Sequence, residues 1–308
     1  MIGFISKRIL SIVPSLWVVL TALFFLLRAV PGGPFDAERK LPPEVEKALR
    51  DYYDLSAPVH VQYWSWLKRL VLHADLGPTF RYGGRTVNEI IGLSLPYSAQ
   101  LGVLAAVVAL AIGVPAGVYA ATKHNTARDH VTMGVAMLGV SVPRFVLAPL
   151  LVLVVSLKLL WLPVARWDSW RHMVLPVICA GLPLAAYVAR LSRAGMLEVV
   201  RSDFVRTARA KGLTERRVIL RHALRGALLP VVTYMGPALS GLLVGSLEVE
   251  RIFNIPGMGR YLVEAASNRD YNLVMGVVLV YGVLVMVLNA VVDIAYRFLD
   301  PRVKAEDR

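Results

Sequence analysis

Residues 95–121 read LPYSAQLGVLAAVVALAIGVPAGVYAA and contain no charged side chain. A helix of this length crosses the hydrocarbon core of a bilayer, which is about 30 Å thick, because each helical residue adds about 1.5 Å. The whole chain has a matching composition, since 56% of its 308 residues are hydrophobic and only 18% are charged. Ordinary soluble domains are about one quarter charged. The sequence therefore predicts an all-α integral membrane protein.

Five further apolar runs predict membrane spans. They are residues 9–27, 131–157, 173–189, 227–247 and 273–298. The run at 9–27 follows Lys7 and Arg8, as the apolar region of a signal peptide does, but it is too long for one and no A-x-A cleavage site follows. We expect it to be retained as the first of six transmembrane helices, an arrangement that puts both termini on one side of the membrane.

The charge of the chain predicts which side that is. In total, 34 Lys and Arg residues face 21 Asp and Glu residues, for a net charge of +13. With a cytoplasmic N-terminus, the cytoplasmic pieces hold 18 basic and 7 acidic residues, a net charge of +11, and +2 remains outside. Basic loops favour the cytoplasm, so we expect an inner-membrane protein with cytoplasmic N- and C-termini. Nucleic-acid binding would not explain the apolar runs; anionic membrane lipid is a further partner for this charge.

The expected organisation has four parts. They are a first transmembrane helix (1–30), an external loop with short helices (31–94), a transmembrane core (95–298) that includes a cytoplasmic segment (190–226), and a cytoplasmic tail (299–308). In the external loop, residues 41–46 (LPPEVE) are typical of a helix start. Tyr63, Trp66 and Leu70 share one face of a helix expected at 59–72. This face either rests on the bilayer surface or contacts an external partner.

The cytoplasmic segment is basic and amphipathic. Leu197, Val200, Phe204 and Ala208 recur at helical spacing, and basic residues occupy the other faces. Gly212 is typical of a helix end, and Thr214 is typical of the residue that caps the next helix. We expect two short helices joined at the glycine. Such a pair either lies on the membrane surface or binds a partner.

Motifs of catalysis and cofactor binding are missing from the sequence. It has no G-x-x-x-x-G-K-[ST] phosphate loop, no G-x-G-x-x-G, no H-E-x-x-H and no G-x-S-x-G. Its six histidines never fall at paired ligand spacing, and its one cysteine, Cys179, lies inside an expected span. We therefore expect no catalytic residue, cofactor or metal, and any uphill transport would need an energy source in another subunit.

Two features of the spans bear on packing and function. Gly113 with Gly117 and Gly241 with Gly245 match G-x-x-x-G, a spacing that lets helices approach closely. Arg144 falls near the middle of the span expected at 131–157, where a charge is costly and should face protein or water. Arg144 is either a pore-lining or gate residue, or it extends to the cytoplasmic surface from a helix that begins later.

Residues 204–213 (FVRTARAKGL) and 221–230 (RHALRGALLP) together resemble the cytoplasmic loop of bacterial ABC importer permeases of the peptide-importing subfamily. That loop has the pattern E-A-A, three residues, G, nine residues, I-x-L-P. Here Arg206, Thr207 and Ala208 stand at E-A-A, Gly212 matches, and residues 222–225 (HALR) replace I-x-L-P. These departures look like the version of the pattern found in the peptide branch.

Further motifs extend the resemblance over nearly the whole chain. They are PGGPF at 31–35, DLG at 75–77, LPV at 162–164, SRAGMLE at 192–198, IFNIPGMGR at 252–260, NRDY at 268–271 and LDPR at 299–302. The first of them looks most like the oligopeptide members. Arg144 departs from the family pattern, because relatives usually have a small or polar residue between the proline and the phenylalanine.

The resemblance implies the architecture of a type I ABC importer permease with a cytoplasmic coupling helix. It also implies a second homologous permease, two ATP-binding subunits in which ATP is hydrolysed, an extracytoplasmic solute-binding protein and a peptide substrate. Residues 204–225 would be the coupling helix that contacts an ATP-binding subunit. The matching positions are Phe204, Arg206, Thr207, Ala208, Lys211, Gly212, His222 and Arg225.

Other functions stay open on the sequence alone. Importers of dipeptides, glutathione or nickel have the same fold, and a fold does not fix the substrate. From a different class, a stand-alone channel or secondary carrier would transport without ATPase partners. A proton-coupled carrier usually has more buried acids than these spans show. A membrane-embedded hydrolase would need paired Asp or His–Glu groups within the spans, and none occurs.

Overall fold

The computed structural model describes the backbone of residues 2–35 and 43–299. Within these ranges all regular secondary structure is helical, apart from one isolated antiparallel bridge between Pro78 and Thr86, and turns and irregular loops connect the helices. The all-α prediction is confirmed. The predicted tail beyond residue 299 and the first residues of the helix start at 41–46 lie outside the described residues, but the helix predicted there does begin at Pro43, as α2 (Pro43–Tyr52).

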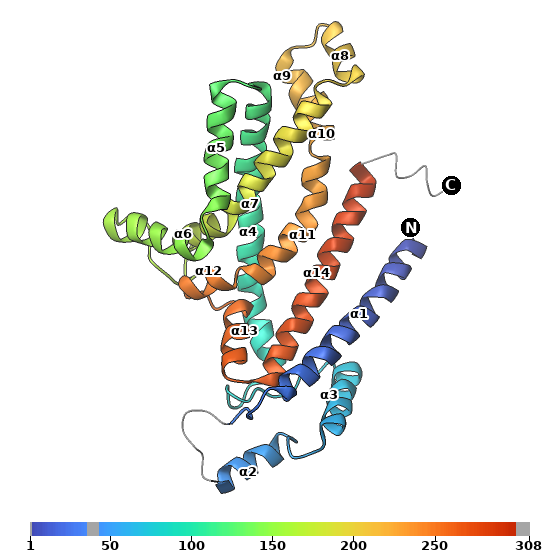
Figure 1. Cartoon of the computed structure of the whole chain (residues 1–308), viewed down its shortest axis with the longest axis vertical. Coiled ribbons are helices and arrows are strands. Elements are labelled where there is room, and N and C mark those ends of the chain that lie inside the picture. Colours follow the sequence, from blue (N-terminus) through green and yellow to red (C-terminus); the bar gives the residue numbers. More distant parts are fainter. Residues whose placement is uncertain (1, 36–42, 300–308) are drawn as a thin grey trace. The chain divides into compact units, whose positions relative to one another are not determined.

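Four long helices coincide with four of the predicted spans (Figure 1). They are α1 (Ile2–Ala29), α4 (Val87–Thr122), α7 (Trp170–Val199) and α14 (Tyr271–Leu299). By length and composition, α4, α7 and residues Tyr271–Val292 of α14 are able to cross a membrane, whereas the described apolar part of α1, Val13–Ala29, is shorter. Two further pairs of helices pass the same test, each as one bent span.

The first bent pair occupies the span predicted at 131–157, and the expectation of one continuous helix there is wrong. The chain forms α5 (Ala127–Ser141), then α6 (Arg144–Leu151), which continues into a π-helical stretch, η1 (Val152–Lys158). The two parts are bent by 102°, and Figure 1 shows α6 turning away from α5. The cause is Pro143, which has no N–H and forces the preceding residue, Val142, into an extended conformation.

The second bent pair includes the span predicted at 227–247. Its apolar part is α11 (Leu229–Gly245), which follows a 49° bend after Ala227. Two short helices, α12 (Leu247–Ile252) and α13 (Met258–Ser267), then lead to α14. The chain divides into two compact units, one formed by Met1–Ser98 with Pro256–Met286 and the other by Ala99–Ile255 with Val287–Arg308.

In the first unit, α3 (Val59–His73) packs against α1. Tyr63 and Trp66 are buried in a cluster with Phe24 of α1 and Met275 of α14, and the Tyr63 hydroxyl lies 2.8 Å from Thr21 Oγ1. Both interpretations of the aromatic face from the sequence are therefore wrong, because Tyr63 and Trp66 are covered by the chain itself and not by lipid or an external partner.

Asp270 holds the start of α14 to the loop before α4 within the same unit. Its carboxylate accepts hydrogen bonds from the backbone N–H groups of Phe80 (2.9 Å), Arg81 (3.4 Å) and Leu273 (3.2 Å). Burial raises the pKa of the Asp270 carboxyl, and the three N–H donors act against that rise by stabilising the charged form.

In the second unit, α4 and α7 approach so closely that glycine is required between them. A β-carbon at Gly113 or Gly117 would overlap the carbonyl oxygens of Ala185 and Ala189, respectively. The prediction of close packing at this G-x-x-x-G pair is confirmed. In the second pair, Gly241 with Gly245, close packing is not seen at Gly241, because a β-carbon there would meet no atom within 4 Å.

Candidate coupling segment and pocket

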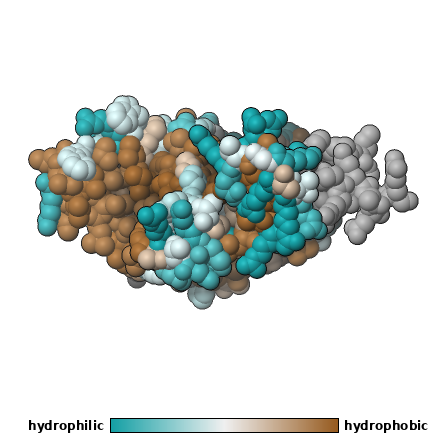
Figure 2. Space-filling model, turned by 90° about the horizontal axis from the view of Figure 1, so that it is seen from above, coloured by the Kyte–Doolittle hydropathy of each residue, from teal (hydrophilic) through white to brown (hydrophobic). Residues whose placement is uncertain are grey.

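Four short helical pieces follow α7 and make up residues 203–227, which we call the basic segment. They are α8 (Asp203–Ala210), α9 (Glu215–Arg217), a π-helical stretch η2 (Val218–Ala223) and α10 (Leu224–Ala227). Figure 2 views the molecule from the end at which α8 and α9 lie, and hydrophilic residues gather on this end next to hydrophobic flanks. The segment therefore presents a polar surface.

The opposite side of the basic segment is apolar and packs on the chain itself. Val205 and Ala208 of α8 lie in a buried cluster with Met196 of α7, Ala121 of α4 and Ala227 of α10. A β-carbon at Gly195 would overlap the carbonyl oxygen of Ala227, so α10 also lies directly against α7. Close-packed side chains therefore connect α8 to α4 and α7.

This packing corrects the amphipathic face predicted from the sequence. The helix is interrupted between Val199, where α7 ends, and Asp203, where α8 begins, so Leu197 and Phe204 do not belong to one helix. Leu197, Val200 and Ala208 contact the chain's own cluster, whereas the side chain of Phe204 is 53% exposed. Three of the four apolar residues predicted to share a face between 197 and 208 therefore do pack together. Phe204 is the exception, because the break between α7 and α8 leaves its side chain pointing away from the cluster.

The turn between α8 and α9 is built as the sequence indicated. Gly212 has φ +75°, the left-handed conformation that ends many helices and that side chains disfavour, so the predicted helix stop is confirmed. Thr214 is the N-cap residue of α9, also as predicted, although its hydroxyl makes no capping hydrogen bond. Arg209 bridges the turn by donating from Nε (3.1 Å) and from one terminal nitrogen (2.7 Å) to the two carboxylate oxygens of Glu215.

The structure places most of the predicted site residues on the surface of the basic segment. The exposed ones are Phe204, Arg206, Thr207, Lys211, Gly212 and Arg225. His222 is half-buried, and Ala208 is buried at 5% exposure. Ala208 therefore packs in the buried apolar cluster and is not part of the exposed surface. The exposed residues present one aromatic ring and several cations.

An ion pair that the sequence did not reveal ties α5 to α7. Asp129, at 1% exposure, accepts hydrogen bonds from Nε and a terminal nitrogen of Arg193, both 2.7 Å long. The backbone N–H of Asn125 donates to the same carboxylate at 3.0 Å, and His124 Nδ1 lies 3.6 Å from it. Since Arg193 lies one turn before Met196 of the apolar cluster, this pair fixes the α4–α5 connection next to the basic segment.

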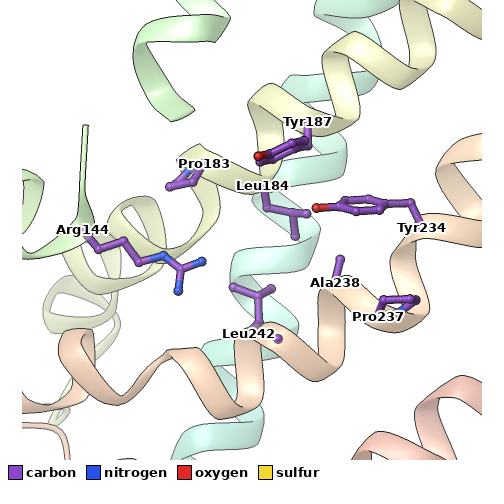
Figure 3. A pocket seen from close by; sticks show the side chains of 9 residues that line it. Arg144, Pro183, Leu184, Tyr187, Tyr234, Pro237, Ala238 and Leu242 are labelled. Atoms are coloured by element: carbon purple, nitrogen blue, oxygen red, sulfur yellow. The ribbon is translucent and has the colours of Figure 1, made fainter. Parts of the chain in front are cut away.

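Arg144 lies at the bend, as the first residue of α6, and not near the middle of a continuous helix; a later helix start was one of the two interpretations left open by the sequence. Its side chain lines a pocket of about 290 Å³ between α6, α7 and α11. Figure 3 shows the guanidinium pointing into the space beside Leu184 and Leu242, with the rings of Tyr187 and Tyr234 on another side. The centroids of the two tyrosine rings are 5.9 Å apart. The pocket thus combines one cation, two phenols and apolar walls.

Two contacts described above were missed by sequence reasoning, for different reasons. Arg209 and Glu215 are six residues apart on either side of the predicted glycine turn, so their opposite charges were a usable signal. Asp129 and Arg193 are separated by 64 residues and belong to different helices. No local pattern pairs them, because their contact depends on how α5 packs against α7.

Among solved structures, the fold is similar to that of ABC importer permeases. A chain of the MetNI methionine ABC transporter, solved in inward-facing conformations, aligns with a TM-score of 0.59 at 15% identity, over 69% of this chain and 97% of that one. A chain of an amino acid ABC transporter solved with histidines aligns with a TM-score of 0.52 at 17% identity, over 68% and 94% of the two chains. The fold class is therefore that of type I ABC importer permeases.

The sequence comparisons give the family. Residues 113–305 match the inner membrane component of binding-protein-dependent transport systems, and residues 1–99 match the N-terminal part of such components. The oligopeptide transport system permease protein OppB of Salmonella typhimurium is 47% identical over 99% of this chain and its own full length. The dipeptide permease DppB of Bacillus subtilis is 40% identical over 99% of this chain and 98% of its own. This chain belongs to the family of binding-protein-dependent transport system inner membrane components.

Proposed function

We propose that this chain is the permease subunit of an ATP-driven importer of oligopeptides. The support for this substrate class is the 46–47% identity to OppB proteins over their full length, compared with 40% to a dipeptide permease and 36% to the glutathione permease GsiC of Escherichia coli. In this proposal the chain forms the path together with a second, homologous permease. Two ATP-binding subunits hydrolyse ATP, and a solute-binding protein delivers the peptide from outside.

The observation that carries the coupling role is the two-sided construction of the basic segment. One side offers the exposed ring of Phe204 and the exposed cations Arg206, Lys211 and Arg225 to a partner. The other side buries Val205 against α4 and α7. A partner that moves the exposed side therefore moves the buried side with it, and rigid transmission of this kind is what a lever between an ATPase and a transport path requires.

The orientation follows from the charge distribution of the sequence. The basic segment and both termini lie in the cytoplasm, where the ATP-binding subunits dock, and residues 31–94 face the solute-binding protein. Transport by a lone carrier or channel is the competing function. Proteoliposomes distinguish the two, because an importer takes up peptide only when the second permease, the ATP-binding subunits, the solute-binding protein and ATP are all present, whereas a lone carrier needs none of them.

Replacing Gly212 tests the lever directly. A β-carbon there meets no atom within 4 Å, so a Gly212→Val substitution acts only through the backbone, whose φ of +75° is strained for a β-branched residue. We expect the variant importer to insert and assemble but to take up peptide at least about tenfold more slowly per ATP hydrolysed, since strain of about 1–2 kcal/mol displaces the turn. The measurement is the ratio of peptide uptake to phosphate release in proteoliposomes.

Gly83→Val is the matched control, because a β-carbon at Gly83 also meets no atom within 4 Å and its φ is not left-handed. It should keep the wild-type ratio of uptake to hydrolysis. A Gly212→Val importer with the wild-type ratio would show that the basic segment is not the coupling element, even if the complex imports peptides.

A further inference from the structure

The pocket beside Arg144 has the chemistry of an anion site with apolar walls. Arg144 supplies its guanidinium from α6, and Tyr234 of α11 directs its hydroxyl toward the same space (Figure 3). Arg190 Cζ lies 5.0 Å from the centroid of the Tyr187 ring, and both residues line a second pocket of about 260 Å³. Among the described residues that line the Arg144 pocket, none is acidic. The described lining therefore carries one positive and no negative side chain.

The size of the pocket limits what it holds. At about 290 Å³ it lies just below the range for small-molecule sites, which begins near 300 Å³. Such a volume accommodates one end of a peptide and not an extended oligopeptide. Leu184, Leu242 and the two tyrosine rings offer apolar and aromatic contact to a side chain without selecting one side chain strongly.

The positive charge of Arg144 then determines which end of a peptide the pocket binds. An importer that accepts many sequences has to recognise what all peptides share, namely the backbone and the two charged termini. The guanidinium of Arg144 repels the N-terminal ammonium, and its fork of N–H donors matches the two oxygens of a carboxylate. On the basis of the oligopeptide importer proposed above, we propose that this pocket binds the C-terminal carboxylate of the peptide in transit, with Arg144 as its charge partner.

The test uses the complete reconstituted importer and two peptides of one sequence, one with a free C-terminal carboxylate and one with a C-terminal amide. We expect Arg144→Gln to lower kcat/KM for uptake of the free acid by about tenfold, the size of one charge-assisted hydrogen bond, and to leave the amide nearly unchanged. Arg144→Glu should reverse the order of the two peptides. Since each peptide is compared between variant and wild type, the preference of the solute-binding protein cancels.

Two further variants separate this role from a structural one. Arg128→Gln removes the same charge from an exposed site on α5 and should alter neither peptide. Glu248→Gln tests an ion pair as the alternative, because the charges of Glu248 and Arg144 both act on the buried thiol of Cys179. If Arg144→Gln and Glu248→Gln slow both peptides equally, or if Arg144→Gln slows neither, the carboxylate assignment is overturned.

A cross-linking measurement covers the case in which the amide is not delivered. With p-azidophenylalanine in place of Tyr234, irradiation during turnover should cross-link radiolabelled free-acid peptide to the permease, and Arg144→Gln should abolish the product. A cross-link unaffected by Arg144→Gln overturns the proposal. If the wild-type complex takes up no peptide at all, the proposed function fails instead, so the two failures are distinguishable.

Discussion

Gly195 illustrates how a single residue sets the distance between two helices. Its missing side chain leaves room for the carbonyl oxygen of Ala227, so α10 rests directly on α7. We expect Gly195→Ala to lower the free energy of unfolding by about 1–3 kcal/mol, because the added methyl group forces the two backbones apart. Thermal unfolding of the purified permease in detergent measures the change.

The control for this prediction is Gly134→Ala. A β-carbon at Gly134, in the interior of α5, meets no atom within 4 Å, and alanine favours a helix over glycine by about 1 kcal/mol. This variant should be as stable as the wild type or more stable. A Gly195→Ala protein that gains stability in the same way would contradict the close approach of α7 and α10.

At the scale of elements, the ion pair between Asp129 and Arg193 joins α5 to α7 by two hydrogen bonds of 2.7 Å. We expect Asp129→Asn to lower the free energy of unfolding by about 2–3 kcal/mol, because it leaves a partly buried guanidinium with a neutral partner. Arg193 is one quarter exposed, so water compensates part of the loss.

A double-mutant cycle separates the pair from its surroundings. If the contact carries the effect, Asp129→Asn combined with Arg193→Gln should be less destabilising than the sum of the two single variants. Strictly additive losses, measured by the same unfolding transitions, would mean that the two side chains stabilise α5 and α7 independently.

The helices were predictable where they depend on local composition. Long apolar runs predicted α4, α7 and α14, and Gly212 predicted the end of α8, because length in a membrane and backbone conformation are local properties. The 102° bend was missed although Pro143 was visible, because prolines are tolerated within membrane helices and only the packing of α6 shows which of them breaks the chain.

The candidate site was predictable only in part. The basic surface of residues 203–227 followed from the sequence pattern, since exposed charges need no partner to be recognised. The outward position of Phe204 did not, because it depends on the break between α7 and α8, and neither did the pocket beside Arg144, because it depends on contacts between helices that are distant in sequence. Non-local packing is what a single sequence leaves undetermined.

At the scale of the whole molecule, the proposed orientation predicts which positions react with reagents outside the cell. Tyr52 is 78% exposed in α2 and Arg216 is exposed in α9, whereas the single cysteine, Cys179, is fully buried. We expect a membrane-impermeant maleimide to label Tyr52→Cys in intact spheroplasts and Arg216→Cys only after permeabilisation, because basic loops stay in the cytoplasm.

The unmodified chain serves as the background in this experiment and should remain unlabelled under both conditions. Labelling of Arg216→Cys in intact spheroplasts, together with protection of Tyr52→Cys, would invert the topology. The basic segment would then lie on the side of the membrane opposite to any cytoplasmic ATPase, and the proposed coupling role would be wrong.

The bend at Pro143 has a consequence for solvent. Breaking a helix removes regular hydrogen-bond partners from the carbonyl groups that end α5 and from the first N–H groups of α6. Acyl chains offer these groups no replacement, so irregular backbone at membrane depth persists only where protein or water covers it. If the proposed topology places the junction between α5 and α6 at membrane depth, we expect either a neighbouring protein subunit or water to cover it there.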